Sequence, residues 1–169
     1  MTTPGRTSSR AEARRAARIA AAQALFQVEQ RGARATDVVE EFRSFRLARD
    51  EGGDLPDLSA SDVAWFADLV LGLELRSAEV DQVLAEALPR GWRMPRLDSV
   101  VRAVLRLGCF ELLARGDVPA RIVVDEYVSV ARSFSDGPEA GFVNGVLDAL
   151  ARRLRPAEFT TGDAAAEGR

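Results

Sequence analysis

The segment LDSVVRAVLRLGCFEL, residues 97–112, decides the fold class of this 169-residue chain. Apolar residues recur along it at intervals of three and four, the spacing that places them on one face of an α-helix. They are Val100, Val101, Val104, Leu105, Gly108 and Leu112, and Leu107, Cys109 and Phe110 make the other sides apolar too. Because a helix that is apolar on nearly every side is buried, we expect this one to run to Gly116 and to be central.

Six further segments carry helical spacing, and none reads convincingly as a strand. They cover residues 10–31, 37–49, 59–73, 77–88, 119–134 and 139–154. Ser59 and Asp62 have the spacing of a capping box at the start of the third. The segment over residues 119–134 contains Ile122-Val123-Val124, which alone would suit a strand. Seven helices predict an all-α protein built by helix-on-helix packing, with a surface loop at 51–58 and flexible tails at 1–9 and 157–169.

The residue types that are missing exclude several kinds of active site. The sequence has no His and no Lys, so all 23 basic residues are arginine. A Ser-His-Asp triad, a Schiff-base lysine and a phosphate-binding P-loop each need one of the missing types. Cys109 is the only cysteine, which leaves no intramolecular disulfide and no Cys/His zinc site. We therefore expect no catalytic residues, no metal and no cofactor.

The chain also lacks signals for a membrane or for export. No apolar run approaches the roughly 18 residues that a membrane span needs. Residues 1–18 contain no apolar stretch of the kind found in a secretory signal. We expect a cytoplasmic protein with no membrane partner.

Charge is distributed unevenly along the chain. Residues 1–34 hold seven arginines against Glu12 and Glu29, a balance of +5, and subtracting this from the net charge of −3 leaves −8 for residues 35–169. A local basic patch on an acidic body is typical of a surface that binds a polyanion. A solvated arm with no partner would have the same composition.

The helix expected over residues 10–31 carries a basic ridge that leads toward an aromatic ring. Its candidate RNA-binding residues are Arg10, Arg14, Arg15, Arg18, Gln23 and Phe26. Arg10, Arg14 and Arg18 are four residues apart, and residues at this spacing stack along one side of a helix. Guanidinium groups bind phosphate oxygens in pairs, and an exposed ring offers a base a stacking platform worth about 1–3 kcal/mol. The pattern fits single-stranded RNA, although Phe26 could equally be a core residue.

Phe142 raises a similar question in the last expected helix. It is one residue out of phase with the apolar stripe of that helix and shares its side with Gly145 and Ala149. A large ring beside small residues either lies half exposed on a contact surface or fills a gap against another helix.

Four motifs in order resemble the NusB family of bacterial transcription antitermination factors. They are R-R-x-A-R-x-x-A-x-Q-A-L-F over residues 14–26, L-x-x-V-x-R-A-V-L-R-L-G-C-F-E-L over 97–112, D-V-P over 117–119 and F-V-N-G-V-L-D over 142–148. The likeness covers nearly the whole chain outside the two tails and the loop around Gly52.

The resemblance implies a single domain over residues 10–156, made of two small packed helical bundles (about 10–76 and 77–156) without catalysis. Members of the family pair with NusE, a small-subunit ribosomal protein, and the pair binds the boxA element of nascent RNA. Bound there, it joins the RNA polymerase antitermination complex and promotes read-through, notably in ribosomal RNA operons. The RNA-contacting residues of the family match Arg14, Arg15, Arg18, Gln23, Phe26 and Phe142 here.

Departures from the family pattern and two other functions also need weighing. Ala16 stands where the family is often basic, which shifts the expected RNA contact toward Arg10 or Arg6. Val101 stands where an acidic residue is associated with the NusE contact, which weakens a salt bridge there. The chain could instead be the NusB-like module of an RNA cytosine methyltransferase, or a helical dimerisation scaffold that never touches RNA. The sequence leaves open whether the free protein is a homodimer, and it assigns no role to residues 42–58.

Overall fold

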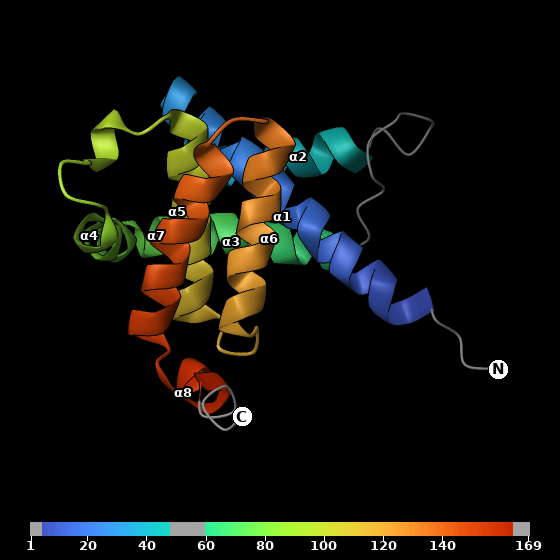
Figure 1. Ribbon diagram of the computed structural model, residues 1–169. Helices are drawn as coiled ribbons and strands as arrows, with labels where there is room; N and C mark the ends of the chain where they lie inside the picture. Colours follow the sequence, from blue (N-terminus) through green and yellow to red (C-terminus); the bar gives the residue numbers. More distant parts are fainter. Residues whose placement is uncertain (1–4, 48–59, 164–169) are drawn as a thin grey trace. The chain divides into compact units, whose positions relative to one another are not determined.

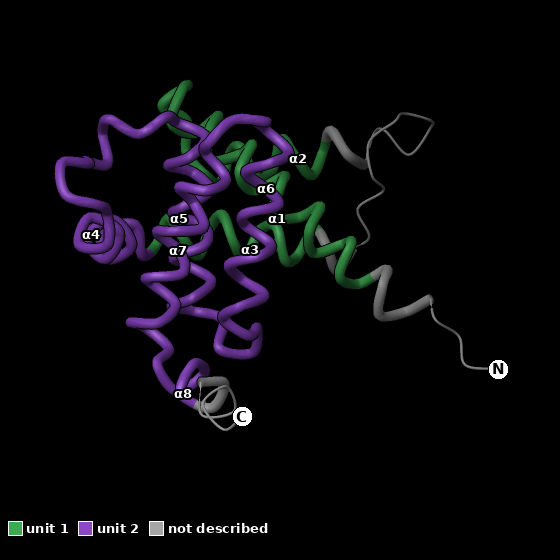
Figure 2. The backbone as a smooth tube through the Cα atoms, in the orientation of Figure 1, with its two compact units in different colours: residues 1–75 green, residues 76–169 purple. Residues whose placement is uncertain are grey.

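The computed structural model describes residues 5–47 and 60–163, and every regular element in those ranges is a helix (Figure 1). The expected all-α class is confirmed. The chain divides into two compact units, residues 1–75 and residues 76–169, which Figure 2 colours separately. Each unit is described by itself.

Three helices make up the described part of the first unit. They are α1 (Gly5–Arg31), α2 (Ala35–Leu47) and α3 (Ala60–Leu75), and α1 packs against both of the others. The helix α1 begins at Gly5, so the prediction of a tail through Ser9 was wrong for residues 5–9. The Ser59 cap and the loop expected at 51–58 lie outside the described residues.

Small side chains on α1 allow close packing in this unit. Ala17, Ala20, Ala21 and Ala24 are all buried, and alanine adds little bulk between neighbouring helices. Across α2 and α3, the rings of Phe42 and Phe66 stack with centroids 5.3 Å apart. The helix α1 ends where Gly32 adopts a φ of +61°, a left-handed conformation that glycine accepts without strain.

The second unit is built around one central helix. Its elements are α4 (Ser77–Ala87), the short 3₁₀ helix η1 (Met94–Arg96), α5 (Ser99–Ala114), α6 (Ala120–Phe134), α7 (Glu139–Leu154) and α8 (Ala157–Asp163). The helix α5 packs against α4, α6 and α7, so the central position expected for it is confirmed. Asp98 caps its start, because its side chain accepts hydrogen bonds from the backbone N–H groups of Val100 and Val101 at 2.9 and 3.4 Å.

Gly108 sets how closely α5 and α7 approach. A Cβ atom at this position would lie 2.7 Å from Cδ1 and 2.9 Å from Cδ2 of Leu147. Both distances are well inside van der Waals contact, so only glycine fits without a shift of the leucine. The glycine in the apolar face of the segment therefore marks a close helix contact.

The helix α8 differs from the flexible tail expected after Pro156. Its Phe159 is buried, and the guanidinium groups of Arg121 and Arg152 lie 5.1 and 4.8 Å from the centroid of this ring. A single large apolar residue in an otherwise small and polar stretch thus anchors one short helix against the unit.

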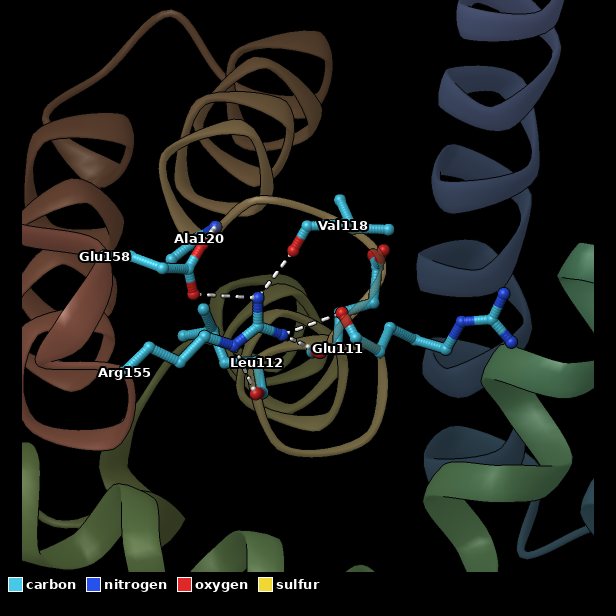
Figure 3. Close-up of polar contacts among 7 residues, drawn as sticks. Glu111, Leu112, Val118, Ala120, Arg155 and Glu158 are labelled. Atoms are coloured by element: carbon cyan, nitrogen blue, oxygen red, sulfur yellow. Dashed lines mark hydrogen bonds and ion pairs between the residues drawn. The ribbon is translucent and has the colours of Figure 1, made fainter.

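Arg155, between α7 and α8, joins the end of α5 to the start of α6 (Figure 3). Its guanidinium donates hydrogen bonds to four backbone carbonyl oxygens, those of Glu111, Leu112, Arg115 and Val118, at 3.0, 2.9, 2.8 and 2.5 Å. Glu158 contacts the same guanidinium at 3.4 Å and accepts a hydrogen bond from the Ala120 N–H at 2.9 Å. One ion pair therefore satisfies carbonyl groups at the C-terminus of α5 and an N–H group at the N-terminus of α6.

Candidate nucleic-acid interface

The helix α1 carries six of the seven predicted RNA-binding residues, and the structure separates them into an exposed and an inward set. Arg10, Arg15, Gln23 and Phe26 are exposed. Phe26 is 38% exposed, so it is not a core residue in this structure. The other two, Arg14 and Arg18, lie against α3.

Arg15 and Phe26 share one side of α1. They are eleven residues apart, and at about 100° and 1.5 Å per residue this places them within about 20° around the axis and about 16 Å along it. Gln23 is exposed on the neighbouring side of the helix. The exposed set thus combines a cation, an amide and an aromatic ring on one stretch of helix, the groups that contact phosphates, base edges and base faces.

Trp65 of α3 explains the inward set. The guanidinium carbon of Arg14 lies 4.2 Å from the centroid of a Trp65 ring, and that of Arg18 lies 5.7 Å away. A guanidinium is attracted to the face of an indole because the ring's π-electrons are negative there. Arg14 is half-buried, and Arg18 is only 3% exposed. The prediction that Arg10, Arg14 and Arg18 form one exposed ridge is therefore corrected, because the ridge turns inward along its length.

Two further arginines of the basic segment contact carboxylates of α2. Arg31 pairs with Glu41 at 2.9 Å, and Arg34 pairs with Asp37 at 3.1 Å. The hydrogen bond between Glu41 and Arg31 lowers the pKa of this carboxyl and raises the pKa of the guanidinium. Both of these guanidinium groups are thus engaged with carboxylates within the first unit.

Phe142 lies in the second unit, on α7. It is half-buried, and its ring packs at a tilt of 46° against Trp92, with centroids 5.0 Å apart. Trp92, in the connection between α4 and η1, is 51% exposed. The ring of Phe142 therefore packs against Trp92 and is also partly exposed at the surface.

Two residues of these surfaces, Trp65 and Trp92, were not predicted as parts of a site. Trp65 lies within the segment over residues 59–73 that was expected to be a helix, but a one-dimensional pattern does not show which arginine reaches it. Trp92 lies in a connection without periodicity. The clustering of Arg90, Trp92 and Arg93 was the one signal in the sequence that could have identified it.

None of the described helices has both the length and the apolar character to cross a lipid bilayer.

Comparisons with known proteins give one consistent result. The family model described as "NusB family" matches residues 15–152. A transcription antitermination protein NusB from Caulobacter vibrioides is 48% identical over 149 residues, which cover 88% of this chain and 99% of the relative.

Solved structures of this family have the same fold. A structure of T. maritima NusB matches with a TM-score of 0.71 at 27% identity, covering 94% of this chain and 99% of the other. The fold also matches a chain in a crystal structure of antitermination factors NusB and NusE in complex with double-stranded RNA. The TM-score is 0.67 at 24% identity, and the match covers 84% of this chain and 98% of the other. The chain belongs to the NusB family.

Proposed function

We propose that this protein is an RNA-binding transcription antitermination factor that acts together with NusE on the boxA element of nascent RNA. It then joins the RNA polymerase antitermination complex and promotes read-through, notably in ribosomal RNA operons, and it acts in the cytoplasm. Its relatives are named as transcription antitermination proteins, and the fold is shared with the NusB of a complex with NusE and RNA. The observation that carries the RNA-binding role is the exposed side of α1 with Arg15 and Phe26.

The exposed residues of α1 have distinct roles in this proposal. Arg10 and Arg15 bind phosphate oxygens, because a guanidinium donates paired hydrogen bonds that match the oxygens of a phosphate. Phe26 stacks on a base, and Gln23 bonds a base edge with its amide. Together they supply the two interactions by which proteins bind a single strand, namely electrostatic attraction to the phosphates and stacking on the bases.

Arg14 and Arg18 take a supporting role rather than a direct one. Their contacts with Trp65 hold α1 against α3, and burial of Arg18 keeps its guanidinium away from solvent. Arg14 is half-buried, so its charge can still add to the positive field near Arg10 and Arg15. Reversal of charge at Arg18 would test the fold of the first unit and not RNA contact.

A titration of boxA RNA against the full chain with NusE, at several salt concentrations, tests the proposal. Phe26→Ala should weaken binding by about 5- to 150-fold, the loss of one stacked base. Arg15→Gln should reduce the slope of log K against log salt by about 0.7, the contribution of one phosphate contact on a single strand. Arg34→Gln removes an exposed arginine that already pairs with Asp37 and serves as the control.

The RNA-binding role of α1 is refuted if Phe26→Ala and Arg15→Gln bind RNA as tightly as Arg34→Gln and the unmodified chain do. The whole proposal is refuted if the unmodified chain gives no RNA complex with NusE present.

A further inference from the structure

The connection between α4 and α5 contains an exposed basic segment that the proposed function does not use. Residues 90–96 read RGWRMPR, with three arginines, one tryptophan and no acidic residue. Arg90, Arg93 and Arg96 are exposed, and Trp92 is 51% exposed. We call residues 90–96 the arginine–tryptophan segment.

This segment has a defined backbone. The N–H of Trp92 donates to the Pro89 carbonyl at 3.0 Å, across Gly91, which has a φ of +91° that favours glycine. Further along, Arg102 of α5 donates hydrogen bonds of 2.9 Å to the carbonyls of both Met94 and Leu97. The central helix thus anchors the segment, and little ordering entropy is lost when a ligand binds to a backbone already held in place.

The Trp92 ring is supported from the second unit itself. Phe142 packs against it at 5.0 Å between centroids, which fixes the ring while about half of its side chain stays accessible. A fixed, half-exposed indole is a suitable platform for a nucleic-acid base, because every base has a π-face that can stack on it.

The carboxylates that flank the segment in sequence are already engaged. Glu86 forms an ion pair with Arg153, and Asp98 caps α5 by accepting from the Val100 and Val101 N–H groups. No ion pair joins a carboxylate of the described residues to the three arginines of the segment. Their positive charge is therefore available to an outside anion.

We propose that the arginine–tryptophan segment is a second single-stranded RNA contact, in which a base stacks on Trp92 and Arg90, Arg93 and Arg96 bind phosphates. The inference rests on the proposed function and adds Trp92 and three arginines beside Phe142, the residue of the second unit that matches an RNA contact of the family. Tryptophan and arginine are also common at protein interfaces, but the buried cores of those interfaces are depleted in charge and need contiguous apolar area. Trp92 is the only large apolar side chain that is exposed in the segment, so the pattern favours RNA.

Substitutions at Trp92 separate stacking from simple packing on Phe142. Trp92→Phe keeps an aromatic face, whereas Trp92→Leu keeps apolar cover on Phe142 without a π-face. With boxA RNA and NusE, Trp92→Leu should weaken binding by about 5-fold or more, and Trp92→Phe should stay close to the unmodified chain. Tryptophan emission should be quenched by RNA in the unmodified chain and not in Trp92→Phe, which retains the buried Trp65.

The arginines are tested one at a time. Each of Arg90→Gln, Arg93→Gln and Arg96→Gln should reduce the salt slope by about 0.7. Arg132→Gln, at an exposed position near the end of α6, removes one charge of the same kind elsewhere in the second unit. It should leave the slope unchanged.

The outcomes distinguish this inference from the proposed function. If the segment variants bind RNA like the unmodified chain while Phe26→Ala and Arg15→Gln weaken binding, the inference is overturned and the proposed function stands. If the segment variants lose NusE binding in the absence of RNA, the surface is a protein interface and the inference is overturned as well. If the unmodified chain does not bind RNA with NusE present, both fall.

Discussion

Replacing Arg155 with methionine should destabilise the second unit strongly, although the residue lies outside every helix. Methionine keeps an unbranched apolar stem but removes the guanidinium. The side chain of Arg155 is only 10% exposed, and its donors reach four carbonyl groups that end α5 or precede α6 (Figure 3). The substitution therefore leaves acceptors unpaired at a point where water has little access.

The loss in the free energy of unfolding depends on which of the four carbonyl groups keep another hydrogen-bond partner when the guanidinium is removed. The Glu111 and Arg115 carbonyls also accept backbone N–H groups, from Arg115 at 2.9 Å and from Val118 at 3.1 Å, so their loss costs little. The Leu112 and Val118 carbonyls have only the guanidinium among the residues that the structure describes. Hydrogen bonds to a charged donor contribute about 1.5–3 kcal/mol each. Taking the lower end, because water can reach part of the site, two such bonds predict a loss of about 3 kcal/mol.

Urea denaturation followed by circular dichroism measures this loss. With a slope of about 2 kcal/mol per molar urea, typical of a chain of this size, the midpoint should fall by about 1.5 M. Arg153→Met is the matched control, because Arg153 is on the last turn of α7, is 47% exposed and pairs with exposed Glu86. A surface pair of this kind contributes less than about 1 kcal/mol. Equal midpoints for the two variants would refute the role given to Arg155.

Three further substitutions and one pH effect follow from the same contacts. Gly108→Ala should cost about 1–3 kcal/mol in urea denaturation, because the new Cβ meets Leu147 at 2.7 Å; an unchanged midpoint would contradict the close packing. Phe159→Ala should release α8 and speed cleavage after Glu158 by a glutamate-specific protease, and an unchanged rate would show that α8 is not held by this ring. Burial raises the pKa of the Cys109 thiol from 9.0 to about 12. Because the thiol of the unfolded chain therefore loses its proton at a lower pH than that of the folded chain, the free energy of unfolding should fall as pH rises from about 9 toward 12. Cys109→Ala should show a shallower fall in urea midpoint over that range, and an identical fall would assign the effect to other groups.

Helical periodicity predicted the elements because burial on one face is a local property of the sequence. The helix α7 begins at Glu139 and ends at Leu154, as its apolar stripe indicates, and α4 begins at Ser77 as expected. The run Ile122-Val123-Val124 lies inside α6. It is helical because the apolar spacing that extends to Phe134 outweighs the β-preference of three branched residues.

The features that were missed depend on contacts between residues far apart in the chain. The short helix α8 has one buried ring and no apolar stripe, so its stability comes from Arg121, Arg152 and Arg155 on other parts of the second unit. Trp92 likewise acquires its place through Phe142, fifty residues later. A period of three or four residues contains no information about such pairs.

The arginines of α1 show how the same limit affects a functional site. Arg10, Arg14 and Arg18 are four residues apart, and each step of four turns the helix by about 40° beyond a full turn. Over eight residues the ridge therefore drifts by about 80°, from the exposed Arg10 to the nearly buried Arg18. Arg15 and Phe26, eleven residues apart, complete three turns with almost no drift and remain on one exposed side. Arg15 and Phe26, which we propose contact one RNA strand, are thus related by the eleven-residue interval, whereas Arg14 and Arg18 of the four-residue ridge join α1 to Trp65.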